Sequence, residues 1–331
     1  MPVQITIIGL GQIGASIGLA LKARGAGVTI VGHDKDPRAA QAAQQAGAID
    51  TWKYNLPDSV RDARIVVLAV PFAEVRGTLE IIAPDLQEGT LVLDTALAKG
   101  AVASWTRELL PAGRFYVGLF PAIHPDHLHG IDYGTPAARA DLFEKSVTVV
   151  TAPPGTPENV FNLVMDFTSL LGSLPLLMDT AEADGLLGKV QVLPQLAAAA
   201  LLDATLDQPG WLEAKKLAAR PYAAMTSAFA YHDDAVSLLE AALENRENMV
   251  RLLNSYITSL LHLRDELEDG DREALGKRLE NAWKGRIRWF EERSEAEWLN
   301  KDAQKIDTPS FGERINQMLF GSALSDRSKR K

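Results

Sequence analysis

Six residues near the N-terminus have the types and spacing of a phosphate-binding turn. They read Gly9-Leu10-Gly11-Gln12-Ile13-Gly14, the G-x-G-x-x-G pattern that binds dinucleotides where it follows a strand and opens a helix. An apolar run at 5–8 precedes it and a helical pattern at 15–24 follows it. We expect Gly9 to permit the tight turn, Gly11 to admit a pyrophosphate, and Gly14 to let the helix pack on the strand. All six are predicted cofactor contacts, at a helix N-terminus whose N–H groups and dipole favour phosphate.

An acidic residue stands where such a site needs one. Asp34 follows an apolar run at 28–33, about 20 positions after the glycines. A carboxylate there accepts hydrogen bonds from ribose hydroxyls and repels a 2′-phosphate, which favours NAD over NADP. Lys35 beside it could tolerate the phosphate, so NADP stays an alternative. Val70 and Pro71 end a further apolar strand at the edge where ligands of such sheets bind, and they are also predicted cofactor contacts.

The elements that must position these residues alternate along the first half of the chain. The expected strands lie at 3–10, 28–33, 65–70, 91–94, 115–119, 147–151 and 174–178, and the expected helices lie at 15–24, 37–46, 72–82 and 157–171. Runs of Val, Ile and Leu without polar alternation are typical of strands buried on both faces. Strand–helix alternation favours a parallel sheet with helices on both faces. We therefore predict an α/β fold whose Rossmann-type parallel-sheet domain spans residues 1–179.

The pattern changes near residue 180. Long amphipathic helical runs at 184–206, 235–267 and 272–292 contain no convincing strand. Residues 180–300 are expected to form an all-helical domain that contributes to a small-molecule substrate site. Helices this long and apolar favour a homodimer through this domain, the alternative being packing within one chain. Residues 301–331 are expected to form a tail with one short helix.

Composition excludes several classes of protein. The net charge is -9, whereas nucleic-acid binders more often carry a basic domain, so no nucleic-acid partner is expected. The chain has no cysteine, which excludes disulfides, thiolate metal sites and cysteine nucleophiles. The N-terminus lacks the pattern of a signal peptide. We see no unbroken run of about 18 apolar residues and expect no membrane span. A cytoplasmic protein is predicted.

With these residues in place, the chain resembles the prephenate/arogenate dehydrogenase family over roughly residues 3–290. The resemblance rests on the glycine element with Asp34 after it, on Leu68-Ala69-Val70-Pro71 with Asp94 and Lys99, on Ala140-Asp141-Leu142-Phe143-Glu144, and on Glu244-Asn245-Arg246-Glu247 with Leu263 to Asp271. It implies an NAD(P)-dependent enzyme of tyrosine biosynthesis. Such an enzyme takes hydride from the ring carbon that bears the hydroxyl, and carbon dioxide is lost as the ring becomes aromatic.

The resemblance implies substrate residues, several of which differ here. The family's His-Pro segment aligns in two registers: counting from the strand gives Phe120, and counting back from Asp141 gives His124. We favour His124 as the catalytic residue because His-Pro is retained. A family serine is replaced by Leu97, and the carboxylate-binding arginine is replaced by Ala224, whereas Arg220 has a counterpart. The family's Ser-His-Leu-Pro-His segment reads Gln191-Val192-Leu193-Pro194-Gln195, so both of its histidines are lost, although Gln191 and Gln195 can still form hydrogen bonds. Predicted substrate contacts are thus Arg220, Gln191, Gln195 and Lys99.

Alternatives remain open for individual residues and for the function. Lys99 could be a solvated lysine at a turn, and Arg220 could form a salt bridge. His124, His127 and His129 lie within six residues, but nothing completes a metal site and no metal is predicted. The chain could be a working prephenate- or arogenate-type dehydrogenase, a same-fold dehydrogenase for another small carboxylate or imine, or a non-catalytic dinucleotide-binding protein.

Overall fold

The computed structural model describes residues 3–130, 132–229 and 235–296. These residues fall into two compact units, which divide between Ala183 and Asp184. The first unit holds all eight strands, and the second holds helices that end at Glu295. The expected tail at 301–331 and its short helix lie outside the described residues.

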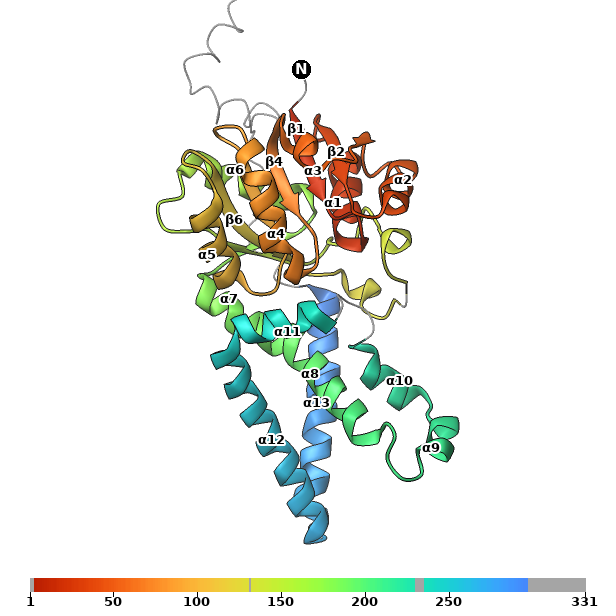
Figure 1. The fold of residues 1–331 in the computed structure, drawn as a ribbon. Coiled ribbons are helices and arrows are strands. Elements are labelled where there is room, and N and C mark those ends of the chain that lie inside the picture. Colours follow the sequence, from red (N-terminus) through yellow and green to blue (C-terminus); the bar gives the residue numbers. More distant parts are fainter. Residues whose placement is uncertain (1–2, 131, 230–234, 297–331) are drawn as a thin grey trace, which may run out of the picture. The chain divides into compact units, whose positions relative to one another are not determined.

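The first unit is built on one eight-stranded sheet (Figure 1). The strand order is β3-β2-β1-β4-β5-β6-β7-β8. The strands are β1 (Gln4–Ile8), β2 (Thr29–His33), β3 (Thr51–Trp52), β4 (Ala63–Leu68), β5 (Leu91–Asp94), β6 (Phe115–Pro121), β7 (Val147–Thr151) and β8 (Leu174–Leu177). The helices of the unit are α1 (Gln12–Ala23), α2 (Pro37–Gln45), α3 (Leu56–Val60), α4 (Phe72–Ile82), α5 (Lys99–Leu109) and α6 (Glu158–Leu170). The α/β class predicted from the sequence is confirmed.

Two strands depart from the expected all-parallel sheet. β6 and β7 pair antiparallel, with Leu119 opposite Val150, and β8 then runs parallel to β7. The cause is the connection: residues 122–130 and 132–146 form loops with short 3-10 turns, and no crossover helix is found in these two described stretches. A strand that returns without a crossover must run antiparallel to its predecessor. The composition of β7 does not reveal this, because its burial is as complete as that of the parallel strands.

The core of the first unit lies on both faces of the central strands. β1, β4 and β5 are buried almost throughout, with Ile5, Ile65 and Leu91 fully inaccessible. Residues of α1 and α6, such as Ile17 and Phe167, belong to the same apolar cluster. Burial on both faces explains why these strands carry no polar alternation. It also leaves the strand ends and their loops as the parts that can meet a ligand.

The second unit is helical. α7 (Thr180–Leu187) leads into it, and the other helices are α8 (Leu193–Thr205), α9 (Trp211–Leu217), α10 (Arg220–Ser227), α11 (Ala235–Glu244), α12 (Arg246–Glu268) and α13 (Arg272–Glu295). The run expected at 235–267 is interrupted at Asn245, which lies between α11 and α12. α12 and α13 form an antiparallel hairpin (Figure 1). Arg278 donates to both carboxylate oxygens of Glu266 within this hairpin.

A short π-helical turn joins α7 to α8. It spans Gly188–Val192, and a Cβ on Gly188 would lie 2.9 Å from Nδ2 of Asn245 and 3.2 Å from Sδ of Met249. Asn245 also donates from Nδ2 to the Asp184 carbonyl at 2.8 Å. Such turns are rare and are frequent at functional sites. The turn includes Gln191, one of the predicted substrate contacts.

One helical run has the length and composition of a membrane span. It covers Thr180–Thr205, 26 residues, of which the most apolar window is one-third buried. The sequence has no unbroken apolar run of about 18 residues, and this still holds, because polar residues such as Asp184 interrupt the helix. A single helix of this kind is weak evidence for a span, since core helices of soluble proteins have the same composition.

Candidate functional site

The glycine-rich turn has the geometry that the sequence predicts. Gly9 has φ +89°, and a Cβ there would lie 2.4 Å from the Ala69 carbonyl oxygen. A Cβ on Gly14 would lie 1.9 Å from the Gly9 carbonyl oxygen. Only glycine fits at either position. At Gly9 the positive φ is one that residues with L side chains rarely adopt, and at both glycines the Cβ would collide with backbone atoms, which cannot move aside as a flexible side chain can. A Cβ on Gly11, by contrast, would meet nothing within 4 Å, so the turn presents open space at the glycine predicted to face the pyrophosphate.

The helix that follows this turn has no side-chain cap. α1 begins at Gln12, and its N-cap residue, Gly11, has no side chain with which to accept a hydrogen bond from the first N–H groups. The first N–H groups of a helix lack intrahelical partners and bind anions readily. Together with the open space at Gly11, this end of α1 fits the phosphates of a dinucleotide.

Asp34 is fixed beside the turn by two backbone donors. Its Oδ2 accepts from Leu10 N at 2.7 Å, and its Oδ1 accepts from Asp36 N at 2.8 Å. Each carboxylate oxygen can accept a second hydrogen bond, so the group remains able to bind ribose hydroxyls. The half-buried residues Val70 and Pro71 follow β4, and Pro71 is the N-cap of α4. The fold therefore gathers the predicted cofactor residues at one edge of the sheet.

Lys99 is fully buried, so a solvated lysine is the wrong description. Neither its side chain nor that of Asp94 is exposed at all. Lys99 Nζ donates to Asp94 Oδ1 at 2.7 Å and to the Leu119 carbonyl at 2.5 Å. Asp94 also accepts from the Tyr116 hydroxyl at 2.7 Å. The ammonium thus ties the end of β5 to β6, and its burial argues against the predicted substrate contact.

The loop at 122–146 carries His124 and returns to the glycine-rich turn. The Thr135 hydroxyl, which is buried, donates to the Leu10 carbonyl at 2.7 Å. Arg139 N donates to the Ser16 hydroxyl at 2.9 Å, and Gln12 Nε2 donates to the Ala137 carbonyl at 3.4 Å. Sequence reasoning missed Thr135 and Ser16 because their partners are more than 120 residues away and no motif marks them.

His124 follows the end of β6 in this loop. Its backbone N donates to the Leu142 carbonyl at 2.6 Å, and its Nδ1 accepts from Asp126 N at 3.1 Å. In the neutral ring, an accepting Nδ1 places the proton on Nε2, so the ring presents a donor. Phe120, the other register, lies within β6 opposite Val149. Phe120 lies in the strand and His124 lies in the loop that follows. Neither position decides between the two registers, so the choice of His124 stays a prediction.

No metal site is evident around these histidines. His127 Nε2 lies 3.3 Å from Asp141 Oδ1, and its ring centre lies 5.5 Å from that of His124. Within the described ranges, no group of three or more His, Cys, Asp or Glu side chains is placed to hold a metal ion.

The predicted substrate residues of the second unit are partly brought together. Gln195 Nε2 donates to the Gln191 carbonyl at 2.8 Å, and the Gln195 side chain is buried. Arg220 is exposed at the start of α10, a helix that packs against α8. Gln191 and Gln195 are therefore neighbours on one helical run, and Arg220 belongs to the helix beside it.

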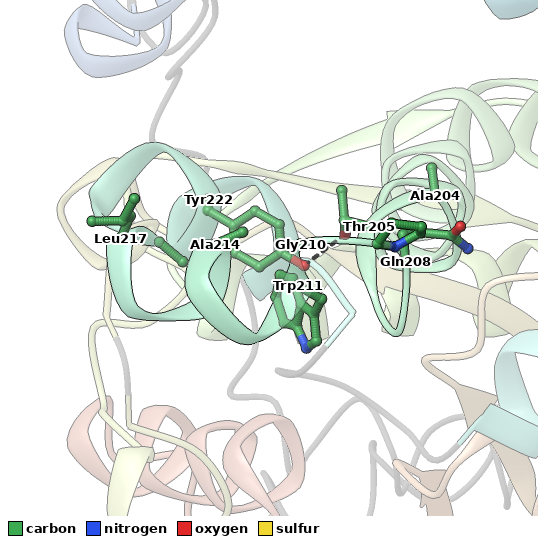
Figure 2. Close-up of a pocket in the computed structure, with 10 residues that line it drawn as sticks. Ala204, Thr205, Gln208, Gly210, Trp211, Ala214, Leu217 and Tyr222 are labelled. Atoms are coloured by element: carbon green, nitrogen blue, oxygen red, sulfur yellow. Dashed lines mark hydrogen bonds between the residues drawn. The ribbon is translucent and has the colours of Figure 1, made fainter.

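A separate pocket of about 480 Å³ lies between α8, α9 and α10. Figure 2 shows Trp211 and Tyr222 along it, with the Tyr222 hydroxyl 2.9 Å from the Thr205 hydroxyl. The two rings lie 5.9 Å apart. The residues that line the pocket are Ala204, Thr205, Gln208, Pro209, Gly210, Trp211, Ala214, Leu217, Ala218 and Tyr222. None of the predicted site residues lines this pocket.

The fold and the glycine–aspartate site define a Rossmann-type dinucleotide-binding protein with a helical second unit. Residues 17–174 match the family model of the prephenate dehydrogenase nucleotide-binding domain, and residues 179–281 match that of the prephenate dehydrogenase dimerization domain. The chain belongs to the prephenate dehydrogenase family, a family of NAD(P)-dependent oxidoreductases. This confirms the resemblance drawn from the motifs, although the matched range begins after the glycine element.

Individual relatives are distant. A cyclohexadienyl dehydrogenase of Zymomonas mobilis is 26% identical over 86% of this chain and 95% of its own length. A prephenate dehydrogenase of Bacillus subtilis is 25% identical over 82% of this chain and 72% of its own length. The crystal structure of Aquifex aeolicus prephenate dehydrogenase with hydroxyphenyl propionate and NAD+ is 22% identical, with a TM-score of 0.74 over 87% of this chain and 98% of that one. This last likeness shows that the fold is shared.

Proposed function

We propose that this chain is an NAD-dependent dehydrogenase that oxidises prephenate or arogenate with loss of carbon dioxide. The observation that carries the proposal is the open cradle at Gly11 beside the fixed carboxylate of Asp34. Family membership supports the reaction, and NAD+ is named in the structure of the Aquifex relative. When bound, the nicotinamide would accept the hydride from the carbinol carbon.

The cofactor residues we propose are those of one sheet edge. The backbone from Gly9 to Gly14, including Leu10, Gln12 and Ile13, would hold the pyrophosphate, and Asp34 would accept from the adenosine ribose. Val70 and Pro71 follow β4 beside this turn, since the Ala69 carbonyl is the atom that a Cβ on Gly9 would strike. The turn offers backbone N–H groups for the phosphates, and Asp34 offers an acceptor for the ribose, so these residues fit a dinucleotide.

For the substrate we propose His124, Gln191, Gln195 and Arg220. His124 would donate from Nε2 to the ring hydroxyl oxygen, because Nδ1 already accepts from Asp126 N. Arg220 would supply the cation that a carboxylate prefers. Gln191 and Gln195 would add neutral hydrogen bonds. Lys99 is left out because it is fully buried in an ion pair.

A second candidate is a same-fold dehydrogenase for another small carboxylate or imine. Ala224 stands where the family has its carboxylate-binding arginine, and it offers no hydrogen bond. A charge-assisted hydrogen bond contributes about 1.5–3 kcal/mol, so its loss would weaken prephenate binding at least tenfold. A non-catalytic dinucleotide-binding protein would share the same cradle and differ only in turnover.

We also propose that the chain works as a homodimer through its helical unit. The family model over 179–281 is named for dimerization. On α12 and α13 several large apolar side chains are at least 38% exposed, namely Ile257, Leu260, Leu261, Trp283, Ile287 and Trp289. Exposed apolar surface of this extent favours a protein partner. Light scattering on the purified chain tests this, and a monomer at micromolar concentration would refute it.

The decisive experiment on function compares Gly11→Ala with Gly77→Ala. An ideal Cβ meets nothing within 4 Å at either glycine, and both residues have ordinary backbone angles, so both variants should fold. Gly77 lies on α4, away from the glycine-rich turn. If the pyrophosphate lies against Gly11, NADH affinity falls at least tenfold in Gly11→Ala only. Equal affinity in both variants would contradict the proposed cofactor site.

Substrate is tested by NADH formation with prephenate and with arogenate. Turnover with either, lost in His124→Ala, would support both the reaction and the favoured register. NADH binding without turnover on either would exclude these substrates and favour the second candidate or a non-catalytic protein.

A further inference from the structure

The residue that follows the Asp34 carboxylate at the end of β2 is a cation, Lys35, which could favour NADP over NAD. Lys35 follows Asp34 directly, and a lysine here could pair with the 2′-phosphate that distinguishes NADP from NAD. Asp34 by itself repels such a phosphate, while Lys35 would attract it. The sequence leaves these two effects in opposition.

The structure adds a third group to this edge. The Lys35 ammonium forms an ion pair with the carboxylate of Glu74. Glu74 lies in the first turn of α4, three residues after Pro71. The carboxylate therefore reaches Lys35 from the strand end that supplies Val70 and Pro71. The positive charge of Lys35 is therefore already paired with the Glu74 carboxylate in the protein without a ligand.

We propose that Glu74 is a specificity-determining residue that secures the preference for NAD over NADP by holding Lys35 in this ion pair. A 2′-phosphate would have to displace Glu74 from Lys35 and then lie near two further carboxylates, those of Asp34 and Asp36. A ribose 2′-hydroxyl is neutral and needs only the acceptor that Asp34 provides. This inference rests on the proposed dinucleotide site.

The pair is suited to a test because both of its side chains are accessible to solvent. Lys35 is 72% exposed and Glu74 is 35% exposed, and ion pairs this accessible contribute little to stability. Glu74→Gln keeps the size of the side chain and should leave the fold unchanged. Arg38, in the first turn of α2, and Lys53, whose backbone contacts Gly32 and His33, are further cations near this end of β2, and their effect must be separated from that of Lys35 in the experiment.

The experiment measures dissociation constants of the full chain for NAD+ and NADP+ by calorimetry, without substrate. Glu74→Gln should raise NADP+ affinity roughly five- to tenfold at low salt, since one charge near the phosphate is removed, and should leave NAD+ affinity within about twofold. The gain should shrink as salt is added. Adding Lys35→Met to Glu74→Gln should abolish the gain.

Glu80→Gln is the matched control. Glu80 lies on the same helix and pairs with Arg76, so this variant removes an equal charge without touching Lys35. If Glu74→Gln changes NADP+ affinity no more than Glu80→Gln, with NAD+ binding intact, the inference is overturned and the proposed function stands. A gain that persists after Lys35→Met would assign the effect to another cation, such as Arg38 or Lys53, and overturn the role of Lys35. Failure of the unaltered chain to bind either dinucleotide would sink the proposed function itself.

Discussion

Replacing Lys99 by methionine should destabilise the first unit strongly. The change removes the ammonium and leaves the Asp94 carboxylate with the Tyr116 hydroxyl and the Ala96 N–H as its donors. Neither side chain of the Lys99–Asp94 pair is exposed, so water cannot replace the lost partner. Breaking a fully buried ion pair by removing one member costs about 3–5 kcal/mol. The packing around the pair is also tight, because a Cβ on Gly118 would lie 3.0 Å from Lys99 Cδ.

A matched surface pair provides the control for this prediction. Lys22 donates to Asp50 at 2.5 Å, but these side chains are 33% and 41% exposed. Lys22→Met should therefore cost about 0–1 kcal/mol. Both variants can be compared by urea unfolding, with hydrogen exchange of β5 and β6 peptides to isolate the first unit. If Lys99→Met costs no more than Lys22→Met, the buried ion pair does not hold β5 to β6 as argued.

Asp94→Asn combined with Lys99→Met gives a second check on the same reasoning. Removing both charges leaves no uncompensated carboxylate, so the double variant should be more stable than Lys99→Met alone. A double variant whose loss equals the sum of the two single losses would show that the charges do not interact across this contact.

Three further predictions follow from individual contacts. In Gly14→Ala the new Cβ would lie 1.9 Å from the Gly9 carbonyl oxygen. The variant should therefore be less stable by about 1–3 kcal/mol through overpacking, and it should no longer bind NADH. A fluorescence titration that gives an unchanged NADH affinity would contradict this. Thr135→Val should cost about 1 kcal/mol, the net value of one hydrogen bond, and speed hydrogen exchange at residues 134–140, since its hydroxyl no longer donates to the Leu10 carbonyl; equal exchange would show that this contact does not hold the loop. Burial alone raises the pKa of Asp50, but hydrogen bonds from its lysine partner and from a backbone N–H, together with the lysine charge, lower it below the ordinary 3.8. A lowered carboxyl pKa stabilises the fold above the ordinary value and ceases to do so as the pH falls through the folded value, so Asp50→Asn should be less stable than the unaltered chain at pH 7 and equal to it in acid; a constant difference in urea midpoint would refute this.

Local patterns predicted the fold class and the geometry of the glycine-rich turn, whereas the cofactor contacts themselves remain a prediction. The glycines, the strand before them and Asp34 lie within one strand–helix–strand stretch, and each makes its contribution through backbone geometry or neighbouring N–H groups. Strand–helix alternation likewise predicted the sheet, because buried strands must be apolar on both faces. Such features depend on neighbours close in sequence, so the order of residues alone determines them.

Contacts between distant segments were decided only by the tertiary structure. The antiparallel direction of β7 depends on how residues 122–146 return, which composition does not record. Asp94 is only five residues before Lys99, but the Leu119 carbonyl that Lys99 also binds lies on β6, so only the pairing of β5 with β6 supplies this second partner. Glu74 and Lys35 are 39 residues apart and pair because the ends of two strands lie together at one edge. The sequence determines which polar groups are available, whereas the packing of strands and loops determines which of them are buried and which of them come into contact.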